Sequence, residues 1–229
     1  MNNCIIIPVR SGSKGLPNKN ILKFCGIPLL GYVLQKLSSS KLFDHVIVSS
    51  DSTEYLDIAQ HYGATDLIER PRLLATDKTP TNEVVKHAIV EFEAHRSQSN
   101  DRYFLTQVTS PLWSQDELQN FIKASLAASS SIVSVSISKQ NPEYNLLKKS
   151  QNGYSLMNES SYNRRQDHPE VYFINGCFYS FKKNTLINTG LIREPECEIF
   201  LMDSLTSMDI DSSTDFDLCE LAALHLISK

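Results

Sequence analysis

The chain has 229 residues, 22 of them lysine or arginine and 26 aspartate or glutamate, which gives a formal net charge of −4. The length suits one sizeable α/β domain, and the mildly acidic balance argues against a general nucleic-acid-binding surface. The sequence has no apolar run near the ~20 residues that cross a bilayer, and we expect no leader before its first strand. None of its five cysteines forms a C-x-x-C pair. We therefore expect a cytoplasmic protein with reduced thiols.

Continuous apolar runs alternate with amphipathic stretches along most of the chain. Residues 4–9 form the first run, which is typical of a strand that helices cover on both faces. Similar patterns predict further strands at residues 45–49, 66–69, 103–108, 132–137 and 171–181. Helical spacing predicts helices at residues 29–38, from a cap at 50–52 to 62, and at 82–96, 115–127 and 215–227. This alternation predicts an α/β fold with a Rossmann-like, doubly wound and mostly parallel sheet.

The pattern changes between residues 138 and 170, which are polar and rich in lysine and arginine. Such a stretch fits a linker, but its alternation near residues 144–154 and the Asn152-Gly153 hairpin signal favour strands that leave the main sheet. We expect residues 138–170 to protrude from a single domain that spans 1–229. Because this segment is too polar to form a core alone, we expect it to cross to a second subunit in a homodimer.

The loop after the first strand carries three cations within ten residues, Arg10, Lys14 and Lys19, interleaved with glycine and serine. Glycines allow backbone N–H groups to turn toward a ligand, and such a nest of amides prefers an anion. The carboxyl end of the first strand of an open α/β sheet is also where ligands bind. The alternative is an ordinary βα turn with a solvated basic face.

The order R-S-G-S-K-G-L-P-N-K-N in residues 10–20 resembles the N-terminal signature of the CMP-sialic acid synthetases, also called N-acylneuraminate cytidylyltransferases. It is not the G-x-x-x-x-G-K-[ST] loop of ATPases. The resemblance implies a fold of the nucleotidyltransferase type and a loop that wraps the phosphates of CTP. The nucleotide-binding residues that it implies here are Arg10, Ser13, Lys14, Gly15, Lys19 and Asn20.

Near the C-terminus, Asp209 and Asp211 alternate in an extended segment, so both carboxylates point to the same side. On the residues alone they fit either a site for a hard divalent cation or the start of a cap for the last helix. The segment S-M-D-I-D-S-S-T-D resembles the family's C-terminal motif, which implies that the two aspartates hold Mg²⁺, or Mn²⁺. We expect Asp215 to be a helix cap. By the same resemblance, the catalytic residues are Arg10, Lys14, Lys19 and Asp211.

Two central segments also resemble the family. Leu74-Ala75-Thr76-Asp77 resembles its L-A-x-D segment next to the cytosine pocket, which adds Asp77, Thr79 and Thr81 to the nucleotide site; these residue types also make ordinary loops. Q-V-T-S-P-L-W at residues 107–113 resembles Q-P-T-S-P-L-R, which implies that Gln107, Thr109 and Ser110 bind the sugar. Trp113 stands where the motif has arginine, so any steadying role of that arginine must be met elsewhere.

The remaining candidates lie in the polar excursion and just after it. Arg164-Arg165-Gln166-Asp167 resembles an R-Q-D-x-P segment that contributes to the sugar site at the dimer interface, although the charges alone fit a solvated hairpin equally well. An arginine fork also matches the carboxylate of a sugar acid. Y-F-I-N-G at residues 172–176 matches the family's Y-R-P-N-G in part, which assigns Asn175 to the substrate and leaves Phe173 in place of an arginine.

These resemblances imply transfer of CMP from CTP to the anomeric hydroxyl of a nonulosonic acid, with N-acetylneuraminate first among the candidates. The same reaction on legionaminate, pseudaminate or Kdo stays open, because Phe173 and Trp113 depart from the motifs. Outside that class, the alternative is a nucleotide-binding protein without transferase activity.

Overall fold

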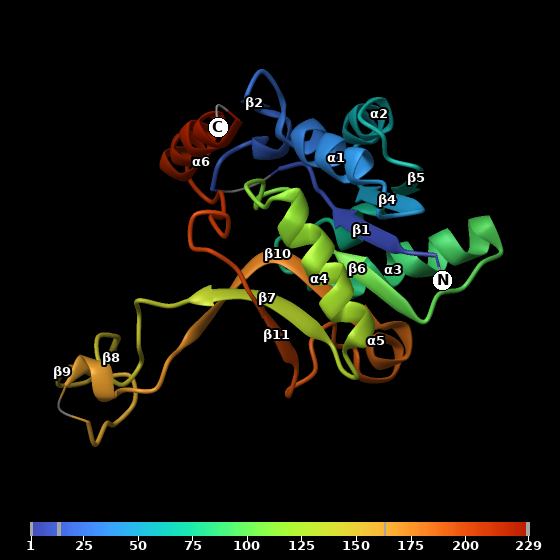
Figure 1. The fold of residues 1–229 in the computed structure, drawn as a ribbon. Coiled ribbons are helices and arrows are strands. Elements are labelled where there is room, and N and C mark those ends of the chain that lie inside the picture. The colour runs from blue at the N-terminus through green and yellow to red at the C-terminus, as the bar shows by residue number, and fades with distance from the viewer. Residues whose placement is uncertain (1, 13–14, 163, 228–229) are drawn as a thin grey trace.

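The structure is a computed structural model that describes residues 2–12, 15–162 and 164–227. Its centre is a seven-stranded sheet in the order β11-β7-β10-β6-β1-β4-β5 (Figure 1). β10 runs antiparallel to both neighbours, and the other pairings within the sheet are parallel. The strands are β1 (Cys4–Pro8), β4 (His45–Ser50), β5 (Asp66–Glu69), β6 (Arg102–Leu105), β7 (Ile132–Ile137), β10 (Tyr172–Lys182) and β11 (Glu198–Leu201).

The two faces of β1 explain why its sequence is apolar at successive positions. Ile5 and Ile7 belong to one buried cluster, whereas Cys4 and Ile6 belong to another. Successive side chains of a strand point to opposite faces, so this sheet is covered on both sides. The predicted doubly wound, mostly parallel fold is confirmed.

Helices supply the two covering layers. The first cluster contains side chains of α1 (Leu29–Ser40), α2 (Thr53–His61), α4 (Gln115–Ala127) and α6 (Ser213–Ile227). The second contains side chains of α3 (Thr81–Arg96) and α5 (Lys183–Thr189). None of the helices in the described part of the chain is long and apolar enough to cross a bilayer.

The predicted hairpin at Asn152-Gly153 is present as β8 (Leu147–Ser150) and β9 (Gly153–Leu156), a separate two-stranded sheet. Together with the short 3-10 helix η3 (Arg165–Asp167) it forms a lobe that stands away from the main sheet (Figure 1). The lobe joins the sheet through the ends of β7 and β10, where Tyr172 pairs with Ile137.

Several short elements lie outside the sequence prediction. They are α5, β11, the small β2 (Lys23–Phe24) and β3 (Ile27–Pro28) hairpin, and the 3-10 helices η1 (Lys19–Ile21) and η2 (Arg72–Leu74). The strand predicted at 103–108 is shorter than expected: β6 ends at Leu105, and the chain then turns across the carboxyl edge of the sheet. That turn brings Gln107 to the site described next.

Candidate functional site

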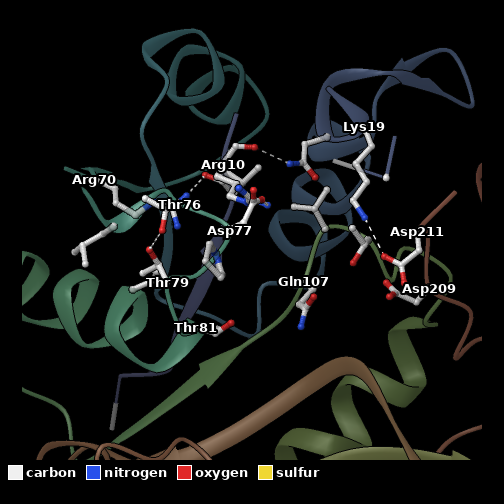
Figure 2. A pocket seen from close by; sticks show the side chains of 18 residues that line it. Arg10, Lys19, Arg70, Thr76, Asp77, Thr79, Thr81, Gln107, Asp209 and Asp211 are labelled. Atoms are coloured by element: carbon white, nitrogen blue, oxygen red, sulfur yellow. Dashed lines mark hydrogen bonds and ion pairs between the residues drawn. The ribbon is translucent and has the colours of Figure 1, made fainter. Parts of the chain in front are cut away.

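A cavity of about 380 Å³ lies at the carboxyl ends of β1, β5 and β6, the edge where open α/β sheets place their ligands. Figure 2 shows its lining side chains, which come from the loop after β1, the segment from β5 to α3, the loop after β6 and the segment before α6. The predicted site residues that line it are Arg10, Gly15, Lys19, Asn20, Asp77, Thr79, Thr81, Gln107, Thr109, Asp209 and Asp211. Ser13 and Lys14 lie outside the described residues.

The loop after β1 is held to its neighbours by side-chain hydrogen bonds. Asp51, at the end of β4, accepts from the Ser11 amide at 3.0 Å and from its hydroxyl at 2.7 Å. Burial disfavours the charged form of Asp51, but these bonds and the charge of Arg70 outweigh it and hold the pKa of Asp51 below its ordinary value. Asn20 donates through Nδ2 to the Arg10 carbonyl at 3.1 Å. Gly12 adopts φ 72°, as expected of a nest-forming glycine.

Two arginines bring positive charge to one side of the cavity. Arg10 Nη2 pairs with Asp77 Oδ1 at 2.5 Å, and its Nη1 donates to the Ala75 carbonyl at 3.4 Å. Arg70 is buried at the end of β5, where its Nη2 donates to the Val9 carbonyl at 2.6 Å. Arg70 Nε has no partner among the described residues. A buried guanidinium with a donor to spare suits a ligand that carries negative charge.

Sequence reasoning missed Arg70, which directly follows the strand predicted at residues 66–69. The available signal was its position, because a cation at the carboxyl end of a strand next to β1 has to face the same edge as the loop at 10–20. Whether its side chain turns inward depends on the Val9 carbonyl and Asp51, both distant in sequence.

Hydroxyls line the wall between β5 and α3. Thr76 and Thr79 share a hydrogen bond of 2.8 Å, and Thr81 begins α3. Figure 2 places these threonines on the Arg10 side of the cavity, with Gln107 between them and the two aspartates. This wall offers neutral donors and acceptors of the kind that can read a nucleobase or a ribose.

The opposite side of the cavity is acidic. Lys19 Nζ donates to the Ile210 carbonyl at 2.5 Å and pairs with Asp211 Oδ1 at 3.3 Å. Asp209 is half-buried and accepts at Oδ1 from the Ser110 hydroxyl at 3.3 Å. Burial raises the pKa of Asp209 above its ordinary value, and the nearby Asp211 carboxylate adds to that rise.

These two carboxylates fit a hard divalent cation such as Mg²⁺. Both line one cavity, and burial together with the neighbouring Asp211 charge raises the pKa of Asp209 despite the opposing charge of Lys19. A divalent cation bound there would stabilise the charged form of both carboxylates. In the part of the chain that the structure describes, no group of three or more His, Cys, Asp or Glu side chains gathers. Asp209 and Asp211 would therefore provide two ligands, and phosphate oxygens and water would complete the shell. Asp215 accepts from the Ser212 amide at 2.8 Å, and its own amide donates to the Ser212 hydroxyl at 3.3 Å. Asp215 therefore takes part in capping α6 as the third helical residue, with Ser212 as the N-cap residue.

Two predicted substrate residues lie behind the cavity wall. Ser110 and Asn175 are both buried, and the Ser110 hydroxyl also lies 3.3 Å from the Asn175 carbonyl. Asn175 accepts at Oδ1 from Ser134 at 2.5 Å and donates through Nδ2 to Ser207 at 2.9 Å. Asn175 therefore ties β7 and β10 to the segment that carries Asp209. With its side-chain amide bonded to Ser134 and Ser207, Asn175 stabilises the cavity wall and does not point at a ligand.

Arg164 and Arg165 are not brought to the cavity of their own chain. Both belong to the lobe, where Arg164 pairs with Asp167 at 2.8 Å. Arg165 lines a second cavity of about 480 Å³ at the base of the lobe, together with Tyr144 and His168. Figure 1 shows the lobe standing apart from β1, β5 and β6, whose carboxyl ends border the main cavity. In this chain Arg165 therefore lines a different cavity from the predicted nucleotide residues.

Residues 4–218 match the model of a protein family described as Cytidylyltransferase. The chain is 30% identical over 215 residues to a CMP-N,N'-diacetyllegionaminic acid synthase of Campylobacter jejuni, covering 93% of this chain and 92% of that protein. It is 33% identical over 217 residues to an N-acylneuraminate cytidylyltransferase of Escherichia coli, covering 93% of this chain and 50% of that longer protein. A pseudaminic acid cytidylyltransferase of Campylobacter jejuni is 29% identical over 223 residues, with 96% of each covered.

Solved structures agree on the fold. A CMP:2-keto-3-deoxy-manno-octonic acid synthetase complexed with CTP superposes with a TM-score of 0.72 at 16% identity, covering 100% of both chains. A 4-diphosphocytidyl-2C-methyl-D-erythritol synthase from Anaerococcus prevotii gives 0.62 at 15% identity, covering 98% of this chain and 96% of the other. At these identities the likeness concerns the fold alone.

Proposed function

The chain belongs to the cytidylyltransferase family, and on that premise we propose that it transfers CMP from CTP to the anomeric hydroxyl of a nonulosonic acid. One observation carries the proposal: a cavity at the strand ends has arginines on one side and two aspartates on the other. This charge pattern suits a triphosphate that meets a divalent cation at the centre of reaction.

In this proposal, different residues of the cavity bind the phosphates, the nucleoside, the metal and the sugar acid. Arg10, Arg70 and Lys19 hold the phosphates, while Asp77, Thr79 and Thr81 form the wall against the nucleoside. A divalent cation on Asp209 and Asp211 would, when bound, neutralise charge on the phosphates. Gln107 stands between these groups and orients the sugar acid toward the α-phosphorus. Positioning and charge neutralisation dominate catalysis in transfers of this kind.

The sugar acid is the finer part of the proposal. Relatives of similar identity carry names for legionaminic, neuraminic and pseudaminic acid enzymes. We propose N-acetylneuraminate as the leading substrate. Gln107 can bind its N-acyl group, and Arg165 of a second subunit can bind its carboxylate. Di-N-acetyl-legionaminate comes second, because the Phe173 ring is 57% exposed where the resembled motif has arginine.

The lobe supports a homodimer. Every residue of β8 and β9 is exposed, yet the hairpin carries Leu147, Tyr154 and Leu156. Exposed apolar side chains on a small projecting lobe favour a protein partner. A second copy that accepts this lobe would also bring Arg165 to its main cavity. Sedimentation at working concentration should show a dimer, and a fully active monomer would contradict this arrangement.

The decisive experiment is a substrate panel. Purified protein should be mixed with Mg²⁺, CTP and each of four acids in turn: N-acetylneuraminate, di-N-acetyl-legionaminate, pseudaminate and Kdo. We expect release of pyrophosphate and a CMP-sugar of the matching mass with at least one acid, and little release when ATP, GTP or UTP replaces CTP. CTP binding without turnover of any acid would instead support a nucleotide-binding protein.

A further inference from the structure

Lys36, on α1, reaches the loop that follows β6 from a different part of the chain. Its Nζ donates to the Pro111 carbonyl at 2.7 Å and to the Trp113 carbonyl, and it lies 4.2 Å from the centre of the Trp113 ring. The Gln115 amide in turn donates to the Lys36 carbonyl at 2.7 Å. A lysine has three donors, and two carbonyls and one ring face occupy them.

Trp113 explains why a cation is needed from elsewhere. Its side chain is fully buried and packs 5.4 Å, centre to centre, from the Phe178 ring. Trp113 stands where the resembled Q-P-T-S-P-L-R motif has arginine, so the loop at 107–113 carries no cation of its own. Lys36 provides a cation from α1, and its ammonium is attracted to the face of the Trp113 ring.

The clamped loop leads directly to the candidate metal site. The Thr109 carbonyl accepts from the Ile210 amide at 2.9 Å, and the Ser110 hydroxyl lies 3.3 Å from Asp209 Oδ1. These contacts fix the segment that carries Asp209 and Asp211. The residues assigned to CTP on the other side of the cavity, such as Arg10 and Asp77, follow β1 and β5 rather than β6.

We infer that Lys36 is a positioning residue that holds the loop at 107–113 from outside the active site, and thereby sets Gln107 and Asp209 for the sugar acid and the metal. This inference rests on the proposed function. It gives this positioning role to a half-buried lysine on α1, where the resembled motif has an arginine within the loop itself.

The charge of Lys36 gives the inference a spectroscopic readout, because Trp113 is the single tryptophan of the chain. Burial lowers the pKa of Lys36 to about 8, while the charge of Glu117 acts in the opposite direction. The other titratable groups that face it are Tyr32 on α1 and Cys177 on β10, and burial raises the pKa of both. Lys36 is therefore the group expected to titrate first above neutral pH.

The first measurement follows Trp113 emission between pH 6.5 and 9.5 in the full chain. We expect the emission to change as Lys36 loses its proton above the ring, and to stay constant in Lys36→Met. The same titration in Lys36→Met, or constant emission in both proteins, would overturn the contact. This measurement requires no turnover, so it stands even if no sugar acid proves to be a substrate.

The second measurement compares Lys36→Met, Lys36→Arg and Gln115→Ala with a control, Lys123→Met, which removes an exposed lysine of α4. We expect Lys36→Met to raise the KM for the sugar acid and the Mg²⁺ concentration for half-maximal activity about fivefold or more. Metal-free CTP affinity, measured by calorimetry, should stay within about twofold. Lys36→Arg should recover part of the loss, Gln115→Ala should show a smaller shift in the same direction, and Lys123→Met none.

If Lys36→Met does not fold, the positioning role is tested with Gln115→Ala. Gln115 is exposed, and its substitution leaves the Lys36 ammonium in place. Unchanged sugar KM and Mg²⁺ requirement in the folded variants would overturn the positioning role. A wild-type protein that turns over no sugar acid would overturn the proposed function instead. In that case the Mg²⁺ dependence of CTP binding can still be compared between wild type and Gln115→Ala. This comparison tests whether the loop at 107–113 holds Asp209 and Asp211 in position to bind the metal.

Discussion

Gly15 and Asp211 are in direct backbone contact across the cavity: a Cβ atom on Gly15 would lie 2.5 Å from the Asp211 carbonyl oxygen. No side chain fits at that distance, so the nucleotide loop and the aspartate segment close on each other only because residue 15 is glycine. We expect Gly15→Ala to separate the two segments and to lower kcat/KM for CTP about tenfold, or ~1.4 kcal/mol.

Gly190→Ala is the matched control for this change. Gly190 adopts φ 69° at the end of α5, where an added Cβ meets no atom within 4 Å. That variant should lower Tm through backbone strain without weakening CTP binding. If Gly15→Ala retains wild-type CTP kinetics, the contact with Asp211 has no functional role.

The paired aspartates predict a metal requirement. We expect Asp211→Asn to reduce pyrophosphate release by about a hundredfold or more, ~2.7 kcal/mol in the barrier, because it removes one of two carboxylates next to the phosphates. Asp217→Asn, an exposed position on α6, serves as the control. Undiminished turnover in excess chelator would rule out the divalent cation.

Arg70 provides a test of a residue that sequence reasoning did not find. Its buried guanidinium faces the cavity and retains an Nε donor without a protein partner among the described residues. We expect Arg70→Met to raise the KM for CTP and also to cost about 1–3 kcal/mol of stability, because the Val9 carbonyl loses its donor. Arg72→Met removes an exposed arginine two residues away and should do neither. Equal CTP kinetics in the two variants would count against Arg70.

The choice of sugar acid is tested at Phe173. Arginine at this position would add up to five hydrogen-bond donors that a phenyl ring lacks. We expect the wild type to favour N-acetylneuraminate in kcat/KM, and Phe173→Arg to increase that preference over di-N-acetyl-legionaminate. A wild-type preference of tenfold or more for the deoxy sugar, roughly 1.4 kcal/mol, would overturn the assignment to N-acetylneuraminate.

Asp66 predicts a pH dependence of stability. Burial disfavours its charge, but hydrogen bonds from Arg96, Thr65 and His45 outweigh this and hold the pKa of Asp66 below 3.8. A depressed pKa of an acid in the folded state contributes stability above the unfolded value, and this is lost as pH falls through the folded value. Asp66→Asn should therefore cost about 1–3 kcal/mol at pH 7 in urea unfolding, and less below pH ~4. A cost that does not change with pH would contradict this.

The fold could be read from local patterns in the sequence, and most of the candidate site from the resemblance of its motifs to a known family. The strand at 4–9, the turn at Asn152-Gly153 and the alternation of Asp209 with Asp211 depend on neighbouring residues, so each was predictable without knowledge of contacts. The cavity then gathered the predicted loop residues, because parallel strands place their carboxyl ends along one edge.

The tertiary structure decided what depends on distant partners. β11 is a strand because its backbone pairs with β7; three of its four side chains are exposed and only Phe200 is half-buried. Arg70 faces the cavity because the Val9 carbonyl and Asp51 hold it there. Lys36 meets Trp113 across 77 positions of sequence. Hydrogen bonds and ion pairs of this range are set by how the layers pack, and no window of sequence contains both partners.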